Sequence, residues 1–224
     1  MHAIRTKYLA IFLAVLFCGS IAGSTAQAKS GRHGKYSEEL LTKTLGFAPG
    51  QSIWLDMNAG DIRILPNLDD HELRLEIQGN HGASTEEMQS WIRQFDVHGN
   101  QANIHLYMPI MNKQTGRVTL YVPASTALNV NLDIGDLTID GIAGDKDLSM
   151  NIGDLKLGDL DAENYASVKI GTSIGSVKDD VFGAQTLGGF DKTKDIIGTG
   201  KYHIRANVSI GSISLRKQSL SGTD

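Results

Sequence analysis

Three aspartates recur at the same position of a short repeated pattern, where their spacing could support metal chemistry. Asp61, Asp136 and Asp154 each follow a glycine and precede an alternating apolar stretch. If the copies stack as neighbouring strands, Asp136 and Asp154 would lie about 5 Å apart. Two such carboxylates repel each other unless water or a cation such as Ca²⁺ separates them. They are therefore weak candidates for a metal site. We favour the simpler interpretation, that each carboxylate caps its own turn in water, because Ser176 and Ser212 replace aspartate in later copies.

Other chemistry has even less support in the sequence. Asp133, Asp136 and Lys156 form the one ionisable cluster that the repeat could bring together for a carbohydrate-active enzyme, which needs converging groups in one groove. No pair of histidines has the i, i+4 spacing of a helical zinc site. We expect His105 and His203 on the outer faces of strands. Serine-hydrolase, phosphate-loop and dinucleotide motifs are missing from the sequence. We therefore predict no catalytic residue and no cofactor.

The repeated pattern itself indicates how these residues are positioned. Each copy alternates apolar and polar residues on both sides of a glycine, which is strand periodicity around a bend. Successive pattern glycines from the second onward lie 18, 22 and 36 residues apart, and such a period suits one rung of a β-solenoid. Ordinary β-hairpins are the alternative. The predicted turn glycines are Gly60, Gly135, Gly153, Gly175 and Gly211.

The segment before the regular repeats has a mixed pattern. It contains one helical signal, in which Ser84 and Glu87 form a capping box and Met88, Trp91 and Phe95 follow at helical spacing. Alternation predicts strands over residues 52–58, 61–65, 72–78, 103–108 and 117–122. We therefore expect an all-β fold, a β-solenoid or β-helix-like repeat domain, with a mixed N-terminal cap containing one short helix.

The first residues of the chain have the order of an export signal. Arg5 and Lys7 lie in a basic stretch, residues 9–18 are apolar, and an A-x-A site precedes Lys29. The apolar run is too short to span a membrane. We predict a secretory signal peptide over residues 1–28, with an uncleaved N-terminal anchor as the alternative. Cleavage would remove Cys18 and two positive charges, so the net charge of -4 would become -6.

Composition limits the remaining classes. With 25 glycines, 4 prolines, one cysteine and 41% hydrophobic residues, the chain is neither collagen-like, disordered nor disulfide-rich. The charge offers no basic surface for nucleic acid. We expect a polar lead-in over residues 29–50, with a short helix opening at Ser37, and a polar tail over residues 218–224. Between them we predict a single domain, residues 51–217, comprising cap strands and helix (51–125) and repeat rungs (126–217).

The order of these segments is similar to that of a known family. A W-L-D-x-N-x-G-D-I-x-I opening (residues 54–64) is followed by D-x-x-E-L-x-L-E (69–76), V-T-L-Y-V-P-A-S (118–125) and repeated I-G-D-L units. This order resembles the bacterial "putative adhesin" family with a DUF4097-type β-strand repeat domain, over about residues 45–217. The resemblance implies a right-handed β-solenoid-like fold and an envelope setting, and it brings no catalytic motif. Residues 184–200 depart from the pattern and predict an irregular rung.

These observations favour an exported, non-enzymatic binding or scaffold protein of the bacterial cell envelope. It would be adhesin-like, reside in the periplasm or at the cell surface, and contact another envelope protein or a surface polymer. Self-association through the solenoid ends is a further expectation. We expect no nucleic-acid partner and no stable membrane insertion after signal cleavage. The alternatives are a polysaccharide lyase or hydrolase on a β-helix and an accessory module for envelope stress or signalling.

Overall fold

The computed structural model describes residues 36–80, 83–109, 116–183 and 185–217, and most of these residues lie in β-strands. The predicted signal peptide, the start of the lead-in and the tail over residues 218–224 lie outside the described residues. The strands are β1 (Tyr36–Gly46), β2 (Ser52–Ala59), β3 (Asp61–Pro66), β4 (Glu72–Asn80), β5 (Ile92–His98), β6 (Gln101–Leu106), β7 (Gly116–Val122), β8 (Ala127–Ile134), β9 (Leu137–Asp140), β10 (Lys146–Ile152), β11 (Leu155–Leu160), β12 (Tyr165–Asp179), β13 (Gln185–Ile197) and β14 (Tyr202–Lys217). The helical elements among the described residues are α1 (Thr85–Trp91) and the 3-10 helix η2 (Ala162–Asn164).

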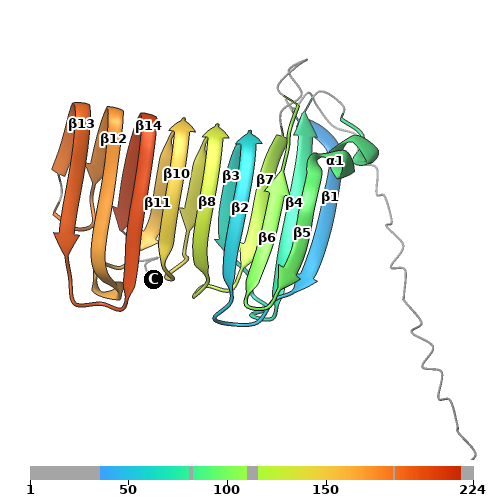
Figure 1. The fold of residues 1–224 in the computed structure, drawn as a ribbon, viewed down its shortest axis with the longest axis horizontal. Helices are drawn as coiled ribbons and strands as arrows, with labels where there is room; N and C mark the ends of the chain where they lie inside the picture. Colours follow the sequence, from blue (N-terminus) through green and yellow to red (C-terminus); the bar gives the residue numbers. More distant parts are fainter. Residues whose placement is uncertain (1–35, 81–82, 110–115, 184, 218–224) are drawn as a thin grey trace, which may run out of the picture. The chain divides into compact units, whose positions relative to one another are not determined.

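The strands form one hydrogen-bonded path that folds back into two facing layers (Figure 1). The path runs β1-β4-β7-β3-β9-β11-β14-β10-β8-β2-β6-β5. Strand β14 joins the layers because its first part pairs with β10 and its last part pairs with β11. Strands β12 and β13 extend the sheet beyond β14. The front layer of Figure 1 thus holds β10, β8, β2, β6 and β5, and the back layer holds β11, β9, β3, β7, β4 and β1.

Most of the molecule is built from strand–bend–strand units that pair in parallel. The five predicted turn glycines occupy the bends, all with positive φ, and they stack in the spatial order Gly60, Gly135, Gly153, Gly211 and Gly175. The order in space therefore differs from the order in the sequence, because β14 lies between the β10–β11 unit and β12. The irregular rung expected over residues 184–200 is strand β13, which pairs antiparallel with β12.

The core lies between the two layers and follows the alternation seen in the sequence. Strand β2 buries every second residue, as does β7. Side chains from both layers form one apolar cluster, in which Leu55, Ile64 and Leu157 are fully buried. Outward positions on the same strands are mostly polar, with Trp54 on β2 as an exception, so these strands contribute one apolar and one largely polar face.

The predicted all-β class with one short α-helix is confirmed. The Ser84–Glu87 capping box is present, and Met88 and Trp91 are buried. Two local predictions are wrong. The segment after Ser37 forms β1, because it completes the sheet beside β4, and Phe95 belongs to β5, because the helix ends at Trp91. The sheet also departs from a regular solenoid, since β1, β4, β5 and β13 pair antiparallel.

Candidate functional site

The repeated aspartates act as hydrogen-bond acceptors between neighbouring units. Asp136 Oδ1 accepts the backbone N–H of Asp154 at 3.0 Å, and Asp154 Oδ1 accepts the N–H of Ser212 at 3.0 Å. Each carboxylate therefore caps the bend of the next unit rather than its own. Asp61 follows Gly60, whose backbone oxygen lies against Gly135. Within the described ranges, no three histidine, cysteine or acidic side chains are grouped as metal ligands would be.

The cluster considered for carbohydrate chemistry does not converge in a groove. Lys156 Nζ lies 4.0 Å from Asp136 Oδ2, with about half of each side chain exposed. Asp133 instead accepts a hydrogen bond from Asn151 Nδ2 at 2.8 Å. These side chains line neither of the pockets described below. The arrangement therefore supplies no pair of groups for acid–base attack on a glycosidic bond.

The two histidines expected on outer strand faces have separate polar partners at the surface. His105 lies on the outer face of β6, where its Nε2 atom is 3.5 Å from Asp56 Oδ2. His203 is exposed on β14, and its Nδ1 atom lies 2.8 Å from Ser167 Oγ. The expected outer-face positions of both histidines are confirmed.

The front layer and the strands that extend it carry a broad face of polar and charged side chains, which we call the polar face. Its outward positions on β8, β10, β14 and β12 are in register across parallel strands, and the antiparallel strand β13 continues the rows. One row is charged and a second row is uncharged. The charged row is Asp147, Arg205, Lys169 and Asp195, and the uncharged row is Asn131, Ser149, Asn207, Gly171 and Thr193. Neighbouring strands are about 4.8 Å apart, so each row presents polar groups at a regular interval.

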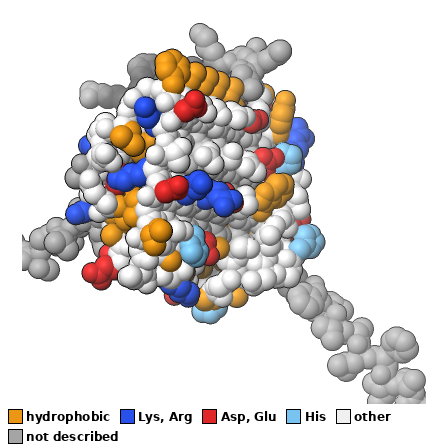
Figure 2. All heavy atoms as spheres, turned by 60° about the vertical axis from the view of Figure 1, so that its left-hand side comes forward, with side chains coloured by type: hydrophobic (Ala, Val, Ile, Leu, Met, Phe, Trp, Pro, Cys, Tyr) orange, Lys and Arg blue, Asp and Glu red, His pale blue; other side chains and the backbone are white. Residues whose placement is uncertain are grey.

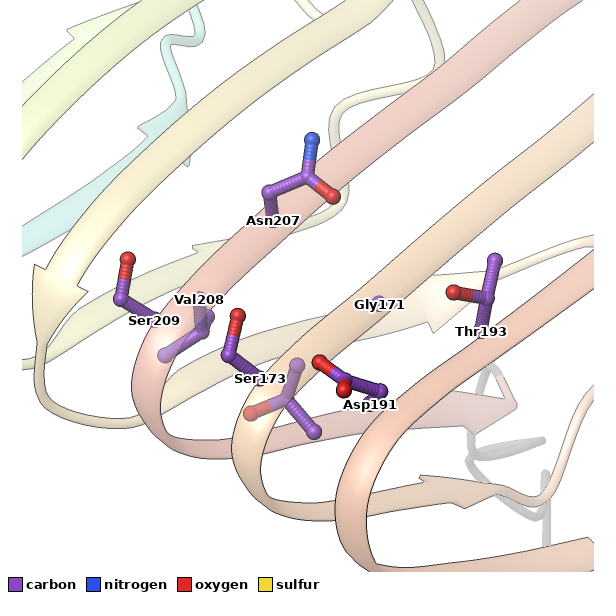
Figure 3. Close-up of a pocket in the computed structure, with 8 residues that line it drawn as sticks. Gly171, Ser173, Asp191, Thr193, Asn207, Val208 and Ser209 are labelled. Carbon is purple, nitrogen blue, oxygen red and sulfur yellow. The ribbon is translucent and has the colours of Figure 1, made fainter.

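The polar face is hollowed at Gly171. A pocket of about 240 Å³ lies between β12, β13 and β14, and Figure 3 shows its polar lining. Gly171 has no side chain in the row between Asn207 and Thr193, which leaves this space open. Asp191 is the one ionisable residue among those that line the pocket. The volume of this pocket is below the roughly 300–1,000 Å³ that is usual for pockets that bind drug-sized ligands.

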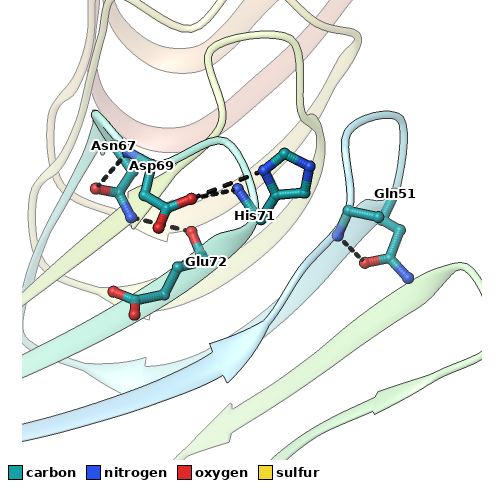
Figure 4. A network of polar contacts seen from close by, with 6 residues as sticks. Gln51, Asn67, Asp69, His71 and Glu72 are labelled. Carbon is teal, nitrogen blue, oxygen red and sulfur yellow. Dashed lines mark hydrogen bonds and ion pairs between the residues drawn. The ribbon is translucent and has the colours of Figure 1, made fainter.

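A second pocket of about 260 Å³ lies beside a turn network (Figure 4). Asn67 donates from Nδ2 to the Glu72 carbonyl at 3.0 Å, and Asp69 Oδ1 accepts the His71 N–H at 2.8 Å. Gln51 accepts the Ala48 N–H at 2.7 Å through Oε1. These bonds satisfy backbone groups within exposed turns, so they account for the residues' positions without a ligand.

A buried ion pair attaches β13 to the stack. Asp179 is fully buried, and its carboxylate accepts the N–H groups of Val181 and Phe182 and a bond from Lys194 Nζ. Burial acts to raise the pKa of Asp179, but the bond from Lys194 and the two backbone donors outweigh it and lower the pKa. The pair therefore joins the end of β12, the following turn and β13.

Replacing Asp179 by asparagine is expected to destabilise the protein by about 3 kcal/mol at neutral pH, because it leaves Lys194 without its buried partner. The folded-state pKa of Asp179 is below its unfolded value. Its contribution is therefore present above about pH 4 and lost as the pH falls through the folded pKa. Urea unfolding at several pH values measures both effects. The control is Asp180→Asn, since Asp180 pairs with Lys178 at the surface and its loss should cost under about 1 kcal/mol. Equal losses in the two variants would contradict the prediction.

Some features of this surface were not identified from the sequence. The rows of the polar face combine residues from β14 and β12, whose neighbourhood depends on the non-sequential stacking. The Asp179–Lys194 pair links residues of an irregular segment with no recognisable motif. One available signal was the polar set Asn129, Asn131, Asn151, Asn207 and Ser209 at alternate positions of the repeats.

Comparison with known proteins gives structural similarity only. No family model and no curated protein matches the chain. A "putative cell adhesion protein" from Clostridium sporogenes is 14% identical, with 80% of this chain and 100% of that chain covered and a TM-score of 0.49. A "putative adhesin" from Bacteroides fragilis is 13% identical (80% and 98% covered, TM-score 0.32), and a "Putative lipid binding protein" from Parabacteroides distasonis is 10% identical (82% and 98% covered, TM-score 0.26). At these values the similarities do not assign a function.

The described residues include no helix that is long and apolar enough to cross a membrane. The residues and fold thus define a two-layer all-β domain with a polar face and shallow surface pockets.

Proposed function

We propose that this chain is an exported, non-enzymatic binding or scaffold protein of the cell envelope, which contacts a partner protein or a surface polymer through its polar face. The single observation that carries the proposal is the regular, in-register array of exposed polar side chains across β8, β10, β14 and β12. Short side chains such as Asn131, Ser149 and Asn207 lose less conformational entropy on contact than long ones. A flat array of this kind suits an extended partner.

The proposal includes the signal peptide and the domain organisation predicted from the sequence. Residues 1–28 would act as the signal peptide, and the remainder would form one domain with the lead-in and tail predicted above. The parallel units would serve as a solenoid-like scaffold, and an adhesin-like role fits such a scaffold. The proposal keeps the three repeat aspartates, Asp61, Asp136 and Asp154, as weak candidates for cation binding. They are weak because the carboxylates of Asp136 and Asp154 already accept backbone N–H groups.

Charge reversal on the polar face tests the proposal. Lys169 and Arg205 are exposed neighbours in the charged row. The double variant Lys169→Glu with Arg205→Glu should abolish capture of the partner from envelope extracts or polymer fractions. The matched control is Lys178→Glu with Arg216→Glu, which makes the same charge change at exposed positions of the other layer. Affinity capture with the folded chain as bait, followed by identification of retained protein and sugar, is the measurement.

The proposal requires partner retention by the unaltered chain and by the control, with loss in the polar-face variant. Retention of nothing, or equal retention by both variants, would count against it. Far-ultraviolet circular dichroism of each variant shows whether a loss of capture reflects unfolding. Turnover of a polysaccharide by the unaltered chain would favour the enzyme alternative instead.

A further inference from the structure

The bend edge of the stack carries a continuous row of exposed apolar side chains, which we call the isoleucine ladder. Ile134, Ile152, Ile210 and Ile174 are direct partners on successive strands, and Phe190 pairs with Ile174. Each isoleucine is 45–48% exposed and Phe190 is 73% exposed. In Figure 2 a row of hydrophobic side chains follows the upper edge of the molecule, the edge at which β8 and β10 end in Figure 1.

Packing inside the fold covers only about half of each isoleucine in the ladder. Each isoleucine precedes a bend glycine and continues the register of the core-facing residues, yet about half of its side chain is exposed at the bend. Isoleucine is among the residue types most often fully buried, so four half-exposed copies at one repeat position are unusual. The residues immediately before them are polar (Asp133, Asn151, Ser209 and Ser173). The ladder is thus an apolar strip beside a polar row, as expected of a contact surface.

The size of the ladder suits a weak, specific contact. At about half exposure each isoleucine leaves roughly 85 Å² accessible, so with Phe190 the strip offers on the order of 500 Å², near the upper end for the largest patch of a typical monomer. Two such strips would bury about 1,000 Å² in total, which is at the lower limit for a specific interface. A self-complementary strip of this size fits a second copy of the same chain.

The flanking charges select one orientation for that second copy. Asp133 and Asp136 lie beside the Ile134 end of the ladder, whereas Ser173 and Ser176 flank Ile174. Parallel packing would place acidic side chains against acidic side chains, which is unfavourable. Antiparallel packing about Ile210 places the acidic end of one copy over the serine end of the other, where Asp191 and Lys192 together add no net charge.

The end of the stack is less suited to the same role. Strand β13 pairs with β12 alone, so its other edge is open among the described strands. That strand carries Asp191, Lys192, Lys194 and Asp195, and charged side chains of this kind discourage pairing between edges. Association through the ladder therefore avoids the obstacle that β13 presents.

We propose that two copies of this chain associate through the isoleucine ladder as an antiparallel, two-fold symmetric dimer with a dissociation constant in the micromolar range. The contact is isologous, with Ile210 near the two-fold axis and Ile134 of one copy facing Phe190 of the other. This surface is separate from the charged row of the polar face. The dimer can therefore be right or wrong independently of the proposed function.

Sedimentation velocity over a micromolar concentration series tests the dimer. The double variant Ile152→Thr with Ile210→Thr keeps β-branched side chains and removes apolar area from the ladder, so it should weaken association at least tenfold. The control is Ile197→Thr, because Ile197 is 93% exposed on β13 and lies outside the ladder. Association should be unchanged in that variant. Monomers at every concentration, or a dimer insensitive to the double variant, would overturn the proposal.

Cysteine cross-linking tests the orientation independently of affinity. In a Cys18→Ser background, Ile210→Cys should give an intermolecular disulfide, because the two copies of that residue meet near the axis. Ile134→Cys should not, since its two copies would be about 19 Å apart, four strand spacings. Equal cross-linking at both positions would exclude the antiparallel arrangement. A monomer that binds phosphatidylcholine vesicles through the ladder would overturn the proposal in favour of a lipid surface.

Discussion

Replacing Gly153 by alanine is expected to destabilise the protein by about 4 kcal/mol or more, an effect large enough to prevent folding of a marginally stable chain. An added Cβ at Gly153 would lie 1.8 Å from the backbone oxygen of Gly135. Backbone atoms cannot move aside as a flexible side chain can, so the two units would have to separate. The glycine also has φ of +141°, which disfavours any other residue.

A matched substitution separates the collision from the backbone strain. Gly189 has φ of +119°, and an added Cβ there would meet nothing closer than Lys192 Cε at 3.5 Å. Gly189→Ala should therefore cost only the strain, about 1–3 kcal/mol. Urea unfolding followed by circular dichroism gives both values. If the two variants lost the same stability, close stacking of the bends would not be what requires glycine at position 153.

The sequence allowed the local elements to be predicted because their signals are local. Strand alternation gave β2, β3, β4, β6 and β7 to within a few residues, and the Ser84 capping box gave the start of α1. The bends at the repeat glycines followed from the same pattern. These features depend on residues close together in the chain, where periodicity and capping act directly.

The arrangement of the units in space could not be predicted in the same way. The position of β14 between the β10–β11 unit and β12 depends on which edges are left to pair, and the repeat pattern is nearly the same in all units. Strand β1 lacked a clear strand pattern and forms beside β4 because that edge offers unpaired backbone groups. The polar face and the isoleucine ladder could not be predicted for the same reason, since each combines residues that are distant in the sequence and adjacent only once the units are stacked.

The burial of Lys146 could not be predicted from the sequence either, because a lysine in an alternating strand is usually exposed to solvent. It is 2% exposed and projects into the interior from the start of β10. Its Nζ atom donates to the Gly144 carbonyl and to the Tyr165 hydroxyl, both at 2.8 Å, and lies 5.0 Å from the centre of the Tyr165 ring. No carboxylate contacts the ammonium group within the described residues. Burial lowers the pKa of Lys146 to about 7, against a weaker opposing effect of Asp145.

This environment predicts that the protein becomes more stable as the pH rises from about 7 to about 10. Over that range the unfolded chain keeps the proton on Lys146 and the folded chain releases it, so the unfolded state binds more protons and stability increases with pH. Below about pH 7 both states carry the charge, and burying it costs roughly 4–5 kcal/mol relative to a neutral amine, at 1.36 kcal/mol per pKa unit.

Lys146→Met tests this prediction, because methionine has a similar length and no charge. The Tyr165 hydroxyl retains the Ile142 carbonyl as an acceptor at 3.4 Å. At pH 6 the variant should be more stable than the unaltered chain, and this advantage should shrink by about 2–3 kcal/mol by pH 9 as the native lysine is buried neutral. Urea unfolding of both chains at pH 6, 7.5 and 9 measures the difference. Other titrating groups cancel in that difference, so curves that remained parallel would show that Lys146 does not titrate inside the fold.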